Sequence, residues 1–195
     1  WWQTALTAPD QLRQRVAFAL SETLVVSDVN GTLFNNALGL ANYYDILTRG
    51  AFGNFRHVLE EVTLSPIMGF YLSSLRNRKA TFDTRGQLLT SPDENYAREV
   101  MQLFSIGLNQ LQPDGSLKLD PVGVPIPTYD QKTITEVAKV FTGWGYYSAD
   151  SNPSFTGAAA NWLTPMMLYP AFHENGVKTI VGGTVRPGDA IAVAR

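Results

Sequence analysis

The sequence of 195 residues contains no cysteine. Without thiols the chain cannot form disulfide bonds, cysteine nucleophiles, iron–sulfur clusters or cysteine-ligated zinc sites. Histidine is nearly as scarce, because His57 and His173 are the only two in the sequence. Any mechanism that requires an imidazole must therefore use one of these two residues.

Charge is scarce as well. Only 16% of the residues are charged, against roughly 25% in an average globular domain, and the formal net charge is −2. No run of lysine or arginine is present to follow a phosphate backbone, so we expect no nucleic-acid partner. No apolar run reaches the roughly 18 to 20 residues that a membrane-spanning helix needs. A sequence poor in charge and rich in uncharged polar residues is typical of exported proteins.

Apolar residues recur at three- and four-residue spacing along much of the sequence, as is typical of helices that bury one face. Leu12, Val16 and Leu20 show this spacing in the first such stretch. The pattern predicts about six helices, over residues 8–28, 36–49, 54–65, 66–75, 91–107 and 131–144. We therefore expect residues 1–195 to form one mainly α-helical domain with an irregular or orthogonal arrangement of helices.

Two segments between or after these helices have a different character. Residues 109–129 are rich in turn signals, with Asp114-Gly115 as a possible hairpin tip. This connection is longer than most, which makes it a candidate lid or binding loop. Residues 145–195 are expected to be irregular with short strands. A small β-hairpin element is predicted near residues 166–184, around a turn at residues 174–176.

The stretch SPDENYAREVMQLFSIG, residues 91–107, carries an unusual density of charge for this sequence. Ser91 is a favourable N-cap residue and Pro92 a favourable first helical residue. Asp93 and Glu94 would then lie near the positive end of the helix dipole. Helix capping alone thus accounts for about half of these polar residues.

Asn95, Arg98 and Glu99 exceed what capping requires. One hypothesis is catalytic: Glu94 or Glu99 acts as an acid or base and Arg98 orients it. The other is structural: the same groups form a polar network that fixes how the helices pack. The structural hypothesis is favoured, and Glu94, Glu99 and Arg98 remain candidate catalytic residues, with Asn95 as a candidate substrate-binding residue.

The two histidines differ in context. His173 precedes Glu174 in a predicted turn, and loops often carry functional residues, so His173 is a further catalytic candidate. An ordinary solvated turn is the favoured alternative. His57 has a spacing to Glu60 and Glu61 that would suit a metal on one helix face, but the further ligands that such a site needs are missing. We therefore expect no metal site and no cofactor.

Aromatic residues gather in a segment rich in glycine, serine and asparagine. This set consists of Trp144, Tyr146, Tyr147, Phe155 and Trp162, with Tyr129 just upstream. Exposed aromatic rings beside amides and hydroxyls suit stacking against sugar rings or apolar polymer units, so Trp144 and Tyr129 are candidate substrate-binding residues. The alternative is that Trp144 and Trp162 close one end of the core, as large aromatic residues usually do. The two interpretations are balanced for Trp144, whereas Trp162 favours packing.

Five blocks in fixed order resemble a known bacterial family, DUF1800, whose function is not known. They are LRQRVAFALSETLVVSD, YYDILTRGAFGNFRHVLEEVTLSPIMGFYLSSL, PDENYAREVMQLFSIGL, PTYDQKTITEVAKVFTGW and HENGVKTIVGGTV. The resemblance implies a mainly helical bacterial protein exported to the periplasm or the extracellular space. It also implies that the gene often lies beside one for an exported protein of the DUF1501 type, a possible partner. Members are usually longer at both ends, so we expect this chain to be a central piece.

Two functional hypotheses follow. The leading one is a cell-surface module for binding or assembly, with an extracellular polymer or glycan as a possible partner. The alternative is a hydrolase with a carboxylate acid or base in a helical scaffold. No G-x-S-x-G, S-x-x-K or nucleotide-binding motif is present to favour a particular enzyme class. The sequence therefore leaves open whether the protein is an enzyme.

Overall fold

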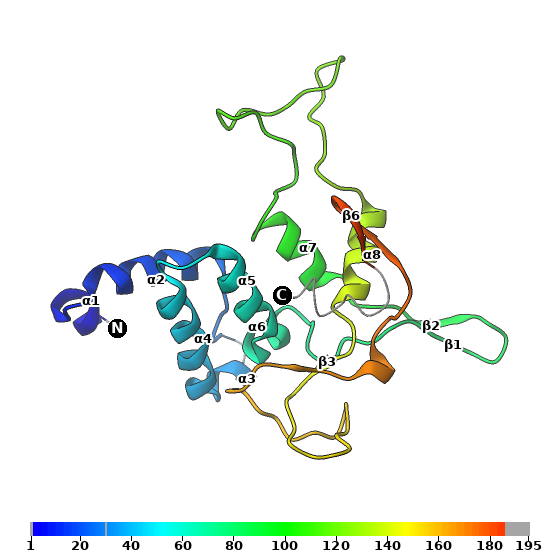
Figure 1. Cartoon of the computed structure of the whole chain (residues 1–195), viewed down its shortest axis with the longest axis horizontal. Helices are drawn as coiled ribbons and strands as arrows, with labels where there is room; N and C mark the ends of the chain where they lie inside the picture. The colour runs from blue at the N-terminus through cyan, green and yellow to red at the C-terminus, as the bar shows by residue number, and fades with distance from the viewer. Residues whose placement is uncertain (1, 30, 186–195) are drawn as a thin grey trace.

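The computed structural model describes residues 2–29 and 31–185 (Figure 1). Within this part of the chain lie eight α-helices, one short 3-10 helix and six short strands, which confirms the predicted mainly α fold. The helices are α1 Trp2–Thr7, α2 Gln11–Thr23, α3 Gly31–Phe34, α4 Ala37–Gly50, α5 Phe55–Leu64, α6 Pro66–Tyr71, α7 Asn95–Gln102, α8 Gln131–Val140 and the 3-10 helix η1 Pro170–Phe172. The strands are β1 Thr81–Phe82, β2 Leu88–Thr90, β3 Trp144–Gly145, β4 Met167–Leu168, β5 Lys178–Ile180 and β6 Gly183–Val185.

The six predicted helices correspond to α2, α4, α5, α6, α7 and α8. The two further helices, α1 and α3, span only six and four residues. They are too short to display a helical repeat of apolar residues, so the sequence pattern did not reveal them. No helix in the described part of the chain is long and apolar enough to cross a membrane.

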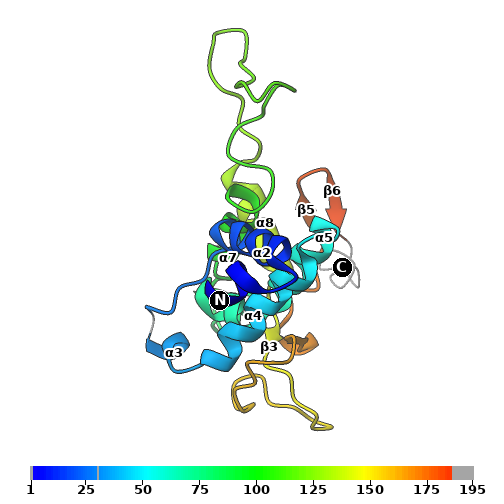
Figure 2. The ribbon, with the colours of Figure 1, turned by 90° about the vertical axis from the view of Figure 1, so that its left-hand side faces the viewer.

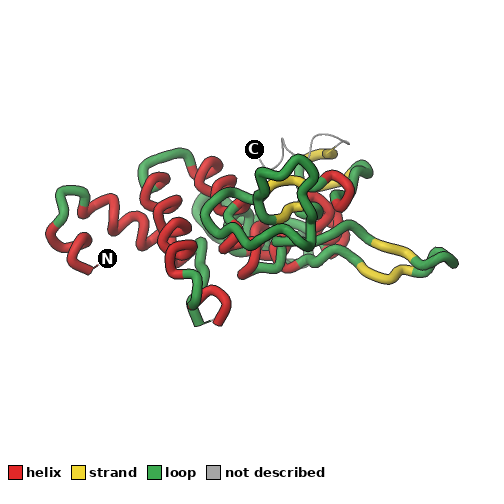
Figure 3. The backbone as a smooth tube through the Cα atoms, turned by 90° about the horizontal axis from the view of Figure 1, so that it is seen from below, coloured by secondary structure: helices red, strands yellow, loops and turns green. Residues whose placement is uncertain are grey.

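One hydrophobic core joins the helices. The helix α4 packs against α2 and α5, and α7 packs against α8. Leu47, Val62 and Ile67 are completely buried in this core. The ring of Tyr96 on α7 meets that of Phe141, just after α8, edge to face at a centroid distance of 4.8 Å. Figure 3 shows α1 to α6 gathered towards the N-terminal side of the molecule, with the strands towards the other side.

The helix α7 begins at Asn95, three residues later than predicted. Ser91 and Pro92 therefore neither cap nor start it. The cause lies elsewhere in the chain: the amide of Asn77 donates to the backbone oxygen of Asp93 at 3.0 Å and accepts from its backbone N–H at 2.8 Å. These two bonds hold residue 93 outside the helix, and its carboxylate instead accepts the backbone N–H of Asn95.

The strands form three two-stranded antiparallel sheets, β1–β2, β3–β4 and β5–β6. The predicted C-terminal hairpin is confirmed in β5–β6, but its turn lies at residues 181–182 and not at 174–176. Gly182 has a φ of 80°, which suits this turn. The strand β4 pairs instead with β3, more than twenty residues earlier in the sequence. Such a distant partner leaves no local sequence signal.

Residues 108–128 form an arm that projects from the body between α7 and α8 (Figures 1 and 2). At its base the backbone N–H of Thr128 donates to the oxygen of Leu108. Two tight turns, at residues 112–116 and 120–124, form its tips, and each contains a glycine with positive φ, Gly115 and Gly123. The arm points away from the segment that contains residues 147–163, on the opposite side of the body.

Candidate functional site

The charged residues of the 91–107 stretch form a contact between two helices. The carboxylate of Glu94, at the start of α7, accepts hydrogen bonds from Thr135 and Gln131 on α8, both at 2.8 Å. Arg98 lies 3.4 Å from the same carboxylate. We refer to these four residues as the α7–α8 polar cluster. Since every member contacts another, this arrangement supports the structural hypothesis for Glu94 and Arg98.

The other two candidates on α7 lie outside this cluster. Glu99 is partly buried, and its carboxylate forms no hydrogen bond or ion pair with any described residue. Asn95 is exposed; its backbone N–H donates to the carboxylate of Asp93, and its side chain forms no hydrogen bond with any described residue. The structure does not bring Glu99 together with His173 or Trp144 in the cavities described below.

His173 is buried, with 3% of its surface exposed, and is not in a solvated turn. Its Nδ1 lies 2.7 Å from the backbone oxygen of Thr142, and the backbone N–H of Glu174 donates to the hydroxyl of the same threonine. Burial lowers the pKa of the His173 imidazole. Gly143 passes so close that a Cβ there would lie 2.8 Å from the backbone nitrogen of His173. These contacts attach the C-terminal segment to the end of α8.

The two aromatic candidates also pack inward. Trp144 is only 8% exposed, in strand β3, and forms a small core with Met166. Tyr129 is partly buried against the main core, and its hydroxyl has no hydrogen-bond partner among the described residues. The position of Trp144 favours the packing interpretation. The rings that line a cavity are two other members of the aromatic set, Tyr147 and Trp162.

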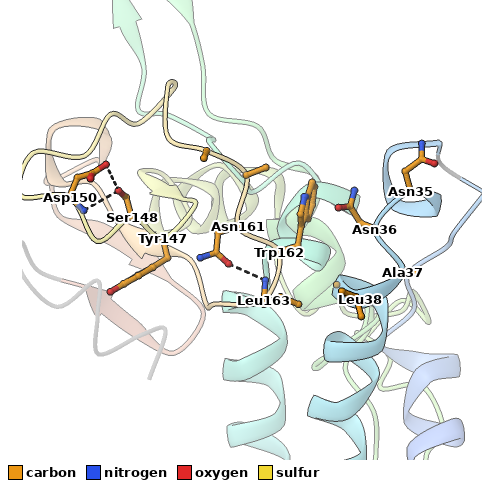
Figure 4. Close-up of a pocket in the computed structure, with 13 residues that line it drawn as sticks. Asn35, Asn36, Ala37, Leu38, Tyr147, Ser148, Asp150, Asn161, Trp162 and Leu163 are labelled. Atoms are coloured by element: carbon orange, nitrogen blue, oxygen red, sulfur yellow. Dashed lines mark hydrogen bonds between the residues drawn. The ribbon is translucent and has the colours of Figure 1, made fainter.

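A cavity of about 710 Å³ lies between the start of α4 and the 147–163 segment (Figure 4). We refer to it as the α4 cavity. Its walls combine side-chain amides, a serine hydroxyl, a carboxylate and two aromatic rings with alanine, leucine and glycine residues. The lining residues are Asn35, Asn36, Ala37, Leu38, Gly39, Tyr147, Ser148, Asp150, Ala159, Ala160, Asn161, Trp162 and Leu163.

The α4 side of the cavity presents hydrogen-bond donors. Residues 37–39 form the first turn of α4, where backbone N–H groups have no partner within the helix. The side chain of Asn36 does not cap them, because its amide nitrogen donates instead to the backbone oxygen of Thr32. Asn35 is bound in the same way to the oxygen of Gly31. In both asparagines the side-chain oxygen has no partner among the described residues, so it can accept a bond from a ligand.

The opposite wall presents a carboxylate. One oxygen of Asp150 accepts the hydroxyl of Ser148 at 2.8 Å, and the second oxygen has no partner among the described residues. Asn161 is engaged internally, since its oxygen accepts the backbone N–H groups of Leu163 and Thr164. Asn161 therefore shapes the wall, while Asp150 retains an acceptor for a ligand hydroxyl or amine.

The Trp162 ring is fixed by packing on other aromatic rings. It meets Phe70 and Tyr146 edge to face, at centroid distances of 5.6 and 5.2 Å. A Cβ at Gly39 would lie 3.0 Å from the Cβ of Trp162, so the absence of a side chain at residue 39 lets this segment approach α4. Arg76 holds the neighbouring loop by a 2.8 Å bond to the oxygen of Ala158. The aromatic wall is thus preorganised.

Sequence reasoning identified the aromatic segment but missed most of this cavity. It singled out Tyr147 and Trp162, whereas Asn35, Asn36 and Asp150 were not candidates. The two walls lie more than a hundred residues apart in the sequence, so no local motif unites them. The available signals were the Asn-Asn pair at 35–36 and the polar composition of residues 148–161.

No group of three or more histidine, aspartate or glutamate side chains in the described part of the chain is arranged to hold a metal ion. His57 is exposed on α5. The chemistry that the α4 cavity offers is therefore that of hydrogen bonding and aromatic contact: backbone donors, amide and carboxylate acceptors, and one fixed indole ring.

Comparison with known proteins places the chain in a family. The model of DUF1800, described as a protein of unknown function, matches residues 1–194. No curated protein and no solved structure shows a significant match to the chain. The family description assigns no activity, so the cavity has to be interpreted from its own chemistry. Because the match spans nearly the whole sequence, the chain belongs to the DUF1800 family.

Proposed function

We propose that this protein is an exported bacterial cell-surface protein that binds a saccharide chain of an extracellular polymer in the α4 cavity. The observation that supports this proposal most directly is the combination of a fixed indole ring with unpaired hydrogen-bonding groups in one cavity. Sugar rings have an apolar face that packs on aromatic rings, and hydroxyls that both donate and accept hydrogen bonds. Trp162 supplies the first requirement. Asp150 and the first turn of α4 supply the second.

Binding fits this cavity better than hydrolysis. Glycoside hydrolysis ordinarily uses two carboxyl groups on either side of the scissile bond. Among the described residues that line the α4 cavity, Asp150 is the only carboxylate. The alternative hydrolase hypothesis used Glu94 or Glu99, and Glu94 is already bound by two residues of α8. Neither carboxylate lines the α4 cavity, so no specific contact favours the enzyme hypothesis.

Export and the partner protein belong to the same proposal. Low charge and the family resemblance support a periplasmic or extracellular location. The DUF1501-type protein stays a predicted partner. A saccharide-binding protein at the cell surface would attach or organise a polymer, for which no catalytic group is needed.

The test is binding of the purified chain to a glycan array, followed by titration calorimetry with soluble oligosaccharides that the array selects. Trp162→Ala removes the indole ring from the cavity wall. We expect the affinity to fall about tenfold or more, as it does when a buried aromatic anchor is lost. Because Trp162 also packs on Phe70 and Tyr146, Asp150→Asn provides a second variant at an exposed position.

Two matched controls accompany these variants. Trp2→Ala removes a tryptophan that is 74% exposed on α1, and Glu22→Gln removes a carboxylate on α2. Both are expected to bind as the unaltered chain does. Absence of binding to every glycan would overturn the proposal. So would binding that survives both Trp162→Ala and Asp150→Asn in chains with unchanged circular dichroism.

A further inference from the structure

A second, smaller cavity of about 230 Å³ lies further along α4. It is lined by α4, by the end of α5 and by Leu163 and Pro165. Leu163 also lines the α4 cavity, so the two cavities adjoin the same short segment. Where this segment lies against α4, the side-chain amide of Asn42 donates to the backbone oxygen of Leu163 at 3.2 Å. The second cavity therefore has a defined place beside the first.

One face of α4 serves both cavities. Leu38 lines the α4 cavity, whereas Asn42, Ile46 and Arg49 line the second one. These positions are separated by four, four and three residues, which places them in one row on a helix. Eight residues of helix, from Leu38 to Ile46, correspond to about 12 Å along the axis. A ligand longer than a single sugar unit could thus extend from one cavity to the other along this row.

The second cavity has an excess of negative charge. Arg49 and Glu61 form an ion pair at 3.2 Å, which neutralises the only cationic side chain among the described residues of its lining. Glu60 also lines this cavity, and its carboxylate has no hydrogen bond or ion pair with any described residue. Its charge therefore has no counter-ion in the part of the chain that the structure describes.

A second observation concerns a buried hydroxyl in the wall of this cavity. Ser65 lines the second cavity, is 3% exposed, and its hydroxyl has no hydrogen-bond partner among the described residues. The side chain also forms no cap hydrogen bond with α6, although it lies at the N-cap position. Buried hydroxyls without a partner are rare, because each loses its hydrogen bond to water. Neighbouring atoms cover the hydroxyl oxygen, so a polar group in the cavity would recover that bond once the side chain rotated towards it.

We propose that the second cavity is a subsite for a protonated amine, and that the saccharide bound by this protein is an amino-sugar oligomer. This inference rests on the proposed function, because it assumes that the α4 cavity holds a sugar unit of the same chain. An ammonium group would pair with Glu60, and a hydroxyl or N–H of the same unit would reach Ser65. Asp150 in the α4 cavity adds a second carboxylate without a cationic partner. Uronic-acid polymers would meet like charge at both places.

The experiment compares three soluble oligomers of equal length by titration calorimetry. They are glucosamine oligomers from chitosan, their N-acetylated counterparts from chitin, and neutral glucose oligomers from cellulose. We expect glucosamine oligomers to bind most tightly. Glu60→Gln should weaken their binding about fivefold, the effect of one partly exposed charge pair, and should leave the neutral oligomers unchanged. The matched control is again Glu22→Gln. The preference should also shrink as salt is added.

The outcomes separate the two proposals. If the neutral and the amine-bearing oligomers bind equally well, and Glu60→Gln alters neither, the amine subsite is wrong while saccharide binding stands. Binding of none of the three, together with an empty glycan array, would overturn the proposed function itself. Uronate oligomers from alginate are titrated as a fourth ligand. If they bind more tightly than the glucosamine oligomers, the charge argument is contradicted. Since Glu60 is only partly buried on α5, its replacement by glutamine is expected to leave the fold intact.

Discussion

The α7–α8 polar cluster and the α4 cavity are both rich in polar groups, but they use these groups differently. In the cluster, both oxygens of Glu94 are occupied by groups of α8, and Arg98 adds a third contact. In the cavity, Asp150 has one oxygen without a protein partner and Asn36 does not cap its own helix. The carboxylate of the cluster thus has its hydrogen-bond partners within the protein. In the cavity, polar groups remain without a partner among the described residues.

This difference identifies the better candidate for binding. A polar group can bind a ligand only with the hydrogen-bonding capacity that the protein leaves unused. Density of charge in the sequence points to residues 91–107, where Glu94 and Arg98 are bound within the protein and the unpartnered side chains of Asn95 and Glu99 line neither cavity. The less charged segments at 35–39 and 147–163 instead hold their unused groups in one cavity. In this chain, unused donors and acceptors are therefore the feature by which we select a candidate binding site, in preference to charge.

The largest expected effect concerns the two tryptophans of the aromatic segment. Trp144→Ala should lower the free energy of unfolding by about 3–5 kcal/mol, because it empties a buried site next to Met166. Chemical denaturation followed by circular dichroism measures this change. If Trp144→Ala instead leaves stability unchanged and abolishes glycan retention, Trp144 is a binding residue, and our assignment of roles to Trp144 and Trp162 is reversed.

The next effect concerns the cluster. Glu94→Ala leaves Thr135 and Gln131 without their acceptor and should cost about 1–2 kcal/mol of stability. Saccharide affinity should not change, because the variant lies outside the α4 cavity. Thermal melting and calorimetry of the same sample test both statements. Loss of binding or activity without loss of stability would show that the cluster is functional, and the comparison would fail.

A smaller effect should depend on pH. The pKa of His173 is lowered in the folded chain by burial, so the unfolded chain binds a proton more readily. The contribution of neutral His173 to the free energy of unfolding is therefore fully present above about pH 6.5, the ordinary pKa of histidine. It is lost as the pH falls towards the lowered pKa of the folded chain. Nearby charges also shift the pKa of His173. It is lowered further by Lys178 and Lys79 and raised by Glu174.

Melting temperatures between about pH 8 and pH 5 measure this dependence. The exposed His57 provides a matched control. His57→Gln should preserve the fall in stability, whereas His173→Gln should flatten it. An identical fall in both variants would assign the pH dependence to other groups.

The smallest effect is expected for Glu99. Its carboxylate has no partner among the described residues, so Glu99→Gln should change stability by no more than about 0.5 kcal/mol. Binding should be unchanged as well. A large drop in melting temperature would mean that Glu99 takes part in the packing network after all, and lost turnover of an identified substrate would revive the enzyme hypothesis.

The sequence predicted those features that depend on neighbouring residues. Helical spacing of apolar residues located α4, α5 and α8, since each buries one face over two or more turns. It located α2 as well, but the predicted buried face was wrong there, because only Ala17 is buried and Leu12 is 67% exposed. The start of α7 was misplaced because Asn77 determines it from outside the helix. The pairing of β3 with β4 and the α4 cavity depend on contacts between distant segments. Local patterns contain no information on such contacts.

The arm has a practical consequence for experiments on this protein. Its two ends are bonded to each other at Leu108 and Thr128, and its tips lie far from the 147–163 segment. Val122, near one tip, is 82% exposed. Since the sequence contains no cysteine, Val122→Cys would create the only thiol in the chain. A fluorescent dye or a sensor surface can then be attached at one chemically unique point, in a known orientation that leaves both cavities open to ligand.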